Sequence, residues 1–160
     1  MLHITEYRMK EIGPIEALIY DSCLKMDAQD FQGYLALCDD SFDYKITAHS
    51  PEINKDMIWL NHDKEGMNVL FKTLPKHNNE KNPLSRHCTV YSIQEQGKDK
   101  VEVVSGLMVF KTYLDGGATE LFAVGKYFDT VSLAGDEPRL LARNVRLDTR
   151  MLQIGYHVPF

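Results

Sequence analysis

The side chains that could do chemistry are scattered through this sequence, and none of them forms a known metal or nucleophile motif. The chain has no His-Glu-x-x-His, no Cys-x-x-Cys and no Cys-x-His paired with Cys-x-x-His. The glycines stand singly or in turns, without a phosphate loop, a dinucleotide-binding fingerprint or a nucleophile elbow. Two histidines and a carboxylate could bind iron only if the fold brought together His49, His62 and Asp63.

A general acid–base site stays open as a second hypothesis. A curved sheet closed by helices forms a cone, and an isomerase or dehydratase needs a proton donor and a proton acceptor near the mouth of such a cone. Each candidate also has a structural interpretation, as a tyrosine at the edge of the core, an acid on the wet face of a strand or a loop histidine. The side chains that fit the hypothesis are Tyr20, Asp43, Tyr44, His49 and His87.

The composition indicates one globular domain over residues 1–160. With 44% hydrophobic residues, a chain of 160 residues can bury a substantial core. The net charge of -5 and the pI near 5.6 argue against a nucleic-acid partner, because that binding needs clustered lysine and arginine. No apolar run approaches the roughly 20 residues that span a bilayer, and the N-terminus lacks the apolar centre of a signal peptide. We therefore expect a cytoplasmic protein that binds neither nucleic acid nor membrane.

The three cysteines are isolated in sequence. Cys23 and Cys38 lie on the apolar faces of predicted helices, and Cys88 lies in a strand-like segment. This placement predicts buried, reduced thiols, with a disulfide as the alternative.

Apolar residues at helical spacing predict three helices. The first begins near Pro14, which suits a first-turn position, and the second follows an N-cap at Asp27 or Asp30. The third should end at Pro75. The three apolar faces consist of Ile15, Leu18, Ile19, Cys23 and Met26, then Phe31, Tyr34, Leu35 and Cys38, then Met67, Leu70, Phe71 and Leu74.

Strand-like segments make up most of the remainder. Residues 41–49 alternate apolar and polar side chains and end in a loop around Pro51, and turns separate five further segments from Arg86 onward. We expect an α+β fold with the helices on one face of a strongly curved, mostly antiparallel sheet. Gly106 and Gly125, inside strands, should mark bulges or bends. The five segments cover residues 86–96, 101–114, 118–133, 139–148 and 151–158.

Two features predict surfaces that something covers. In residues 101–114 both alternating sets of side chains are apolar, whereas an antiparallel strand with one wet face alternates apolar and polar residues. A partner chain could supply the second cover. The apolar C-terminal residues Val158, Pro159 and Phe160 are expected to be docked.

Three stretches, in this order, resemble the small (beta) subunits of Rieske-type aromatic-ring-hydroxylating dioxygenases and related oxygenases. They are EALIYDSCLKMDAQDFQGYLALCDDSFDYKI (16–46), PLSRHCTVYSI (83–93) and LLARNVRLD (140–148). The resemblance implies the cone fold of nuclear-transport-factor-like and ketosteroid-isomerase-like proteins. It also implies a heterohexamer of three alpha and three beta chains. The Rieske 2Fe–2S cluster and the mononuclear non-haem iron are then expected in the alpha subunit, and no cofactor in this chain.

Our leading hypothesis is therefore a non-catalytic small subunit that trimerises through the outer face of its sheet. It would support the catalytic alpha subunit in the oxidation of an aromatic acid or a sulfonate. Residues 50–82 are unlike the aromatic-acid dioxygenases, and the chain is closer to sulfonate-oxidising members such as methanesulfonate monooxygenase. Two rival hypotheses are a free-standing cone-fold isomerase or dehydratase and a ligand-binding module without catalysis.

The same hypothesis assigns a set of interface residues. An arginine that opens a strand can bind a carboxylate or several carbonyls, so we expect Arg86 and His87 at a subunit seam or a structural corner. The arginines of the last long strand are either surface ion pairs or docking contacts for a partner's carboxylates. The predicted interface comprises Arg86, His87, Arg143, Arg146, Val158, Pro159 and Phe160.

Overall fold

The computed structural model describes the backbone of residues 2–77, 81–152 and 159–160, and the side chains of these residues except 2–12 and 77. Its helices are α1 (Leu2–Asp27), α2 (Phe31–Ala36) and α3 (Lys64–His77). Its strands are β1 (Cys38–Ser50), β2 (Lys55–Asp63), β3 (Leu84–Glu95), β4 (Lys100–Thr112), β5 (Thr119–Ser132) and β6 (Arg139–Leu147). Among the described residues, no helix is long and apolar enough to cross a membrane.

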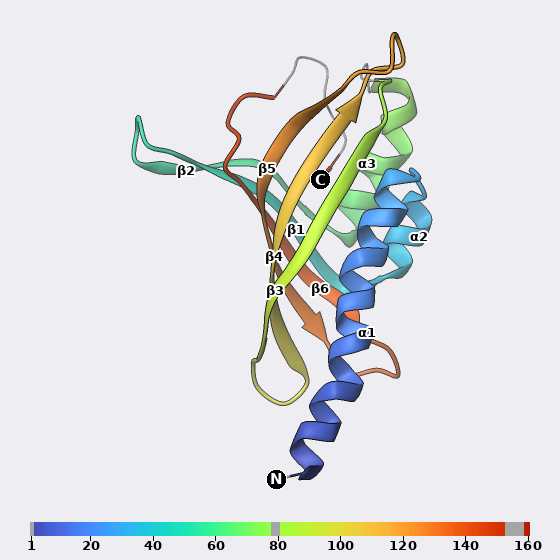
Figure 1. The fold of residues 1–160 in the computed structure, drawn as a ribbon, viewed down its shortest axis with the longest axis vertical. Coiled ribbons are helices and arrows are strands. Elements are labelled where there is room, and N and C mark those ends of the chain that lie inside the picture. The colour runs from blue at the N-terminus through green and yellow to red at the C-terminus, as the bar shows by residue number, and fades with distance from the viewer. Residues whose placement is uncertain (1, 78–80, 153–158) are drawn as a thin grey trace.

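The strands form one sheet in the order β2-β1-β6-β5-β4-β3, and the helices lie on one of its faces (Figure 1). Every neighbouring pair is antiparallel except β1 and β6, which run parallel. The hairpin of β1 and β2 extends away from the rest of the sheet (Figure 1). The predicted α+β fold, with helices on one face of a mostly antiparallel sheet, is confirmed.

The core contains the helical faces that the spacing predicted. Ile15, Ile19 and Met26 of α1 are almost fully buried, as are Met67 and Phe71 of α3. Burial of each such side chain stabilises the fold by about 1.5–3 kcal/mol relative to leaving it exposed. These helices therefore pack on the sheet through the stripes that their sequences encode.

Capping residues set the starts of the two short helices. The Asp30 carboxylate accepts a hydrogen bond from the Gly33 N–H at 2.9 Å and caps α2, which settles the choice between Asp27 and Asp30. The Asp63 carboxylate likewise accepts one from the Gly66 N–H at 2.8 Å, at the start of α3. Asp27 instead binds a residue of β3.

Several element boundaries differ from those expected. The first helix starts at Leu2, so Pro14 lies inside it, and α3 continues past Pro75 to His77. Proline removes one backbone hydrogen bond, and here the flanking residues nevertheless keep the helix going. Strand β2 was not predicted, because its sequence has four consecutive apolar residues, 57–60, instead of an alternation of apolar and polar residues. The expected strand over 151–158 is absent at Met151 and Leu152, and its other residues lie outside the described ones.

One of the two glycines inside strands lies beside a bulge. Gly106 pairs with Thr89, next to the register shift of β3 between Val90 and Ser92, whereas Gly125 is in regular register with its neighbours. A Cβ at Gly125 would collide with the backbone carbonyl of Arg146, and one at Gly106 would collide with the ring of Tyr91. Both glycines therefore allow close approach of a neighbour.

We expect Gly125→Ala to lower the free energy of unfolding by roughly 1–3 kcal/mol, because backbone has to move to admit the methyl group. Urea unfolding measures this change. Gly135→Ala is the matched control, since the atom nearest to its added Cβ is 3.9 Å away. Equal stabilities for the two variants would contradict the close-approach explanation.

Candidate subunit interface

Arg86 forms a buried corner between three parts of the chain. Its Nη1 donates to the Asp27 carboxylate of α1 at 2.7 Å, and its backbone N–H donates to the same carboxylate at 3.0 Å. Its Nη2 donates to the Pro159 carbonyl at 2.8 Å. The Arg86 side chain is only 1% exposed. The structure therefore supports the structural-corner interpretation of Arg86, and its contact with another subunit stays a prediction.

His87 lies on the opposite face of β3 from Arg86 and is exposed. Its Nε2 is 3.2 Å from the Ser85 hydroxyl, and its ring meets the Phe110 ring edge-on at 5.2 Å. The Arg86–His87 dipeptide therefore divides between the two faces of the sheet, as strand alternation requires.

The last two residues are docked on the chain itself. Phe160 is 1% exposed, its ring stacks near that of Phe122 at 6.3 Å, and its carbonyl accepts a hydrogen bond from the Tyr44 hydroxyl at 2.9 Å. Pro159 is also buried. Val158 lies outside the described residues. Pro159 and Phe160 thus pack against the sheet beside Arg86, and their role between subunits stays a prediction.

Arg143 lies in the core and not on the surface. It forms a two-point ion pair with Asp129, with distances of 2.8 and 2.9 Å, and donates to the Ser22 hydroxyl of α1 at 3.0 Å. Its guanidinium also stacks on the Tyr127 ring at 3.8 Å. Burial is the largest effect and disfavours its charge, but the charge and hydrogen bonds of Asp129 together with Tyr34 and Tyr127 outweigh burial and raise the pKa of Arg143 well above its ordinary value. Within the single chain, Arg143 is therefore neither a surface ion pair nor an exposed docking contact.

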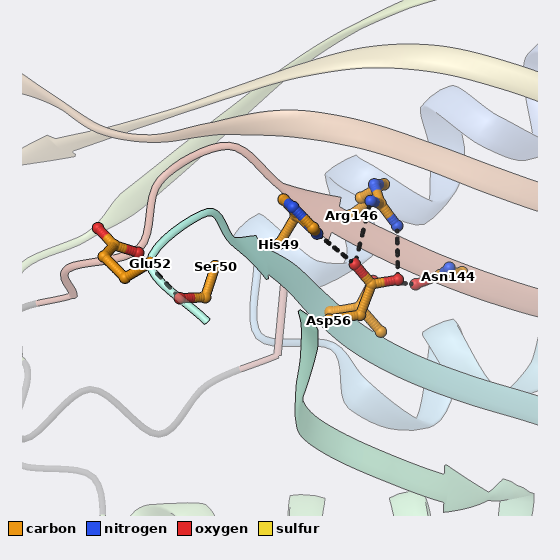
Figure 2. Close-up of polar contacts among 7 residues, drawn as sticks. His49, Ser50, Glu52, Asp56, Asn144 and Arg146 are labelled. Atoms are coloured by element: carbon orange, nitrogen blue, oxygen red, sulfur yellow. Dashed lines mark hydrogen bonds and ion pairs between the residues drawn. The ribbon is translucent and has the colours of Figure 1, made fainter. Parts of the chain in front are cut away.

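Arg146 belongs to an exposed polar cluster near the turn of the β1–β2 hairpin, where His49 and Asp56 pair (Figure 2). Both of its terminal nitrogens are 3.3 Å from the Asp56 carboxylate, and His49 Nδ1 is 2.9 Å from the same group. Beside them the Thr47 hydroxyl donates to the Asn144 side chain at 2.9 Å. The hydrogen bond with His49, followed by that with Arg146, lowers the pKa of Asp56.

A second exposed pair lies nearer to the tip of the hairpin. Arg150 binds the Glu52 carboxylate. The same carboxylate accepts a hydrogen bond from the Ser50 hydroxyl (Figure 2). The hydrogen bond from Arg150 contributes most to lowering the pKa of Glu52 to about 2. Glu52 and Asp56 both follow the strand predicted over residues 41–49, after which a loop was expected around Pro51. No local sequence pattern identified these two carboxylates.

The acid–base candidates are not brought together. Asp43 and His49 are exposed on the outer face of β1, whereas Tyr44 is buried on its inner face. The hydroxyl of Tyr20 accepts a hydrogen bond from the Val90 N–H at 3.4 Å, at the seam of α1 and β3. A surface hollow of about 450 Å³ lies elsewhere, between α2 and α3.

The proposed iron triad of His49, His62 and Asp63 does not assemble either. Through the described parts of the chain, no three His, Cys, Asp or Glu side chains group as a metal site would require.

The outer face of the sheet carries several exposed apolar side chains among polar ones such as Lys126. The inner side chains of β4, such as Val103 and Val109, are fully buried, but Met108 on the other face is 46% exposed. Its apolar neighbours on the adjacent strands are similarly open, with Tyr91 at 64%, Leu121 at 53% and Phe128 at 41%. The two-sided apolar pattern of residues 101–114 therefore corresponds to one face covered by the chain's own helices and one face left bare.

Solved structures of other proteins share the fold of this chain. The chain aligns with a crystal structure assigned as the beta subunit of an aromatic-ring-hydroxylating dioxygenase from Novosphingobium aromaticivorans, with a TM-score of 0.81, 22% identity, and coverage of 92% and 95% of the two chains. A nuclear-transport-factor-like protein from the same species aligns with a TM-score of 0.68, 13% identity, and coverage of 94% and 90%. The predicted cone fold is confirmed.

The chain belongs to the ring hydroxylating beta subunit family, whose model matches residues 23–154. It is 38% identical over 149 residues to the methanesulfonate monooxygenase hydroxylase subunit beta of Methylosulfonomonas methylovora, covering 88% of this chain and 82% of the relative. It is 30% identical over 145 residues to the 2-aminobenzenesulfonate 2,3-dioxygenase subunit beta of an Alcaligenes species, covering 91% and 96%. The predicted family is confirmed, and the subunit hypothesis is favoured over the free-standing enzyme.

We expect Asp129→Leu to destabilise the chain by about 3–5 kcal/mol, because it leaves the buried Arg143 guanidinium without its counter-charge. The double variant Asp129→Leu with Arg143→Met should recover most of that loss, since both charges are then gone. Urea unfolding of the two variants measures the difference. Asp56→Asn, which weakens an exposed pair, is the control and should change stability far less. A mild effect of Asp129→Leu would show that the pair does not hold the core.

Proposed function

We propose that this chain is the assembly subunit of a Rieske non-haem-iron oxygenase that acts on a sulfonate. In this proposal the iron and the 2Fe–2S cluster are held by a catalytic alpha subunit, and three copies of each chain form the complex. The observation that carries the proposal is the bare apolar face of the sheet, beside a cone interior that the chain fills itself. A surface of this kind on a folded chain is typical of a protein–protein interface.

The interior of the cone supports an assembly role over catalysis. An enzyme of this fold needs an open cavity with converging acid and base groups. Here the Arg143–Asp129 pair and the Tyr127 ring occupy the space under α1, and Phe160 packs against Phe122. In this proposal, the side chains inside the cone stabilise the fold and take no part in catalysis.

The outer face supports contact with a second copy of this chain. The β1–β2 hairpin extends from the body (Figure 1), and Ile53 and Ile58 on it are each 62% exposed. In the proposed complex, the exposed isoleucines of the hairpin on one copy pack against the exposed Met108 and Phe128 of the next copy. Such a head-to-tail contact closes into a ring when the rotation between copies is one third of a turn.

The proposed substrate class and location rest on other observations. Both curated relatives are named for sulfonates, methanesulfonate and 2-aminobenzenesulfonate, which favours a sulfonate over an aromatic acid as the substrate of the complex. All three cysteines are free. Free thiols persist in a reducing compartment, which supports the cytoplasm.

The mass of the isolated chain in solution tests the proposed trimer. We expect the wild-type chain to have three times its 18.4 kDa mass and Phe128→Lys to have the mass of one chain, because a charge on the apolar face opposes its burial. Light scattering after size exclusion measures the mass, and circular dichroism checks the fold.

Val69→Lys is the matched control for Phe128→Lys. Val69 is 54% exposed on α3, on the other side of the sheet, so the control should keep the wild-type mass. A Phe128→Lys variant that stays trimeric, or a control that also dissociates, would contradict the proposed interface.

A separate prediction concerns cofactors. We expect the chain alone to purify without iron or acid-labile sulfide, and both to elute with it only after co-expression with an alpha-type oxygenase subunit. Metal analysis of the gel-filtration fractions tests this. Iron bound stoichiometrically to the isolated chain, or a partner that never co-elutes with it, would overturn the subunit proposal.

A further inference from the structure

Two contacts fix how α1 lies against β3. Near one end the Tyr20 hydroxyl accepts a hydrogen bond from the Val90 N–H, and near the other the Asp27 carboxylate binds Arg86. Along α1, residue 23 falls between residues 20 and 27, and along β3, residue 88 falls between residues 86 and 90. Helix and strand alternation therefore bring Cys23 and Cys88 face to face at the middle of the seam.

The two thiols lie in the packed cluster where α1 meets β3. Each thiol has the largest effect on the pKa of the other, and no disulfide joins them. Cys23 is 5% exposed, while Cys88 is only half-buried, so a small molecule can approach from the Cys88 side. The pair thus lies inside the α1–β3 seam, between the Tyr20 contact and the Asp27 contact.

The surroundings stabilise a thiolate on Cys23. The hydrogen bond from Cys88 contributes most, burial opposes it, and the positive charges of Arg143 and Arg86 add to it, which together lower the pKa of Cys23 to about 7. The pKa of Cys88 is raised, first because it keeps the proton that it donates to Cys23 and second because it is buried. A thiolate beside a protonated thiol is the arrangement from which disulfides form.

The third cysteine lacks these features. The Sγ of Cys38 donates to the Tyr34 carbonyl at 3.4 Å, and burial raises the pKa of Cys38 to about 12. The chain therefore contains its own unreactive reference thiol.

We propose that Cys23 and Cys88 form an oxidation site, at which a hydroperoxide converts the two thiols into a disulfide that ties α1 to β3. The Cys23 thiolate attacks the outer oxygen of the hydroperoxide, the O–O bond breaks, and the departing alkoxide or hydroxide takes a proton. This leaves a sulfenic acid on Cys23. The Cys88 sulfur then attacks the Cys23 sulfur, the S–S bond forms, and water leaves with the proton of Cys88.

The balance is two electrons. One hydroperoxide is reduced to an alcohol or water plus a second water, and two thiols are oxidised to one disulfide. The cross-link closes a long loop between α1 and β3 and so restrains the unfolded chain, which raises the melting temperature. This site is independent of the proposed function, because both cysteines lie in the helix–strand seam, away from the bare outer face.

The experiment treats the reduced wild-type chain with one equivalent of hydrogen peroxide and blocks the remaining thiols. Intact mass and a non-reducing peptide map then identify the product. We expect loss of two hydrogens, a peptide cross-linked through Cys23 and Cys88, an unmodified Cys38 and a melting temperature several degrees higher. The oxidation rate should rise with pH around a midpoint near 7, since the Cys23 thiolate is the nucleophile.

Three variants sharpen the result. Cys38→Ser should form the same cross-link, whereas Cys23→Ser and Cys88→Ser should lose it. The wild-type measurement decides the question even where a variant fails to fold. A cross-link that includes Cys38, a sulfinic acid on Cys23 beside a free Cys88, or no reaction under these conditions would each overturn the proposal.

Discussion

The buried ion pair of Arg143 and Asp129 is the interaction on which the rest of this structure depends. It joins β5 to β6 by two charge-assisted hydrogen bonds, and through Ser22 it also attaches α1 to the sheet. Both charges are almost completely removed from water, so either one without the other would carry a large desolvation cost. The helix therefore lies where the pair can be satisfied, and the pair and the Tyr127 ring occupy the space between α1 and the sheet.

The two faces of the sheet differ in what covers them. The helices cover one face, and the other carries exposed Tyr91, Met108, Leu121 and Phe128. One fold can host a catalyst or an assembly subunit, so the role of this chain has to be argued from its own side chains and not from the fold.

The sequence predicted the features that depend on neighbours along the chain. Helical spacing identified the buried faces of α1 and α3, and strand alternation identified β3 to β6. It did not predict β2, whose alternation is irregular, or the partners of Arg143 and Arg86, which lie far away in sequence. One signal for the Arg143 site was present in Tyr127, Asp129 and Val131, where a charged residue occupies an inward position of an apolar alternation. A charge placed there needs a buried counter-charge, and Arg143 faces it in the β5–β6 register.

The Arg86–His87 dipeptide shows how one short stretch can serve both faces. Adjacent residues of a strand point in opposite directions, so Arg86 enters the core while His87 stays outside. Inside, Arg86 connects α1, β3 and the last residues of the chain through Asp27 and Pro159. Outside, His87 lies opposite Met108 in register, at the margin of the bare apolar face. Because Arg86 and His87 are adjacent in β3, the backbone of this one strand fixes the position of the outer face relative to α1 and the docked C-terminal residues.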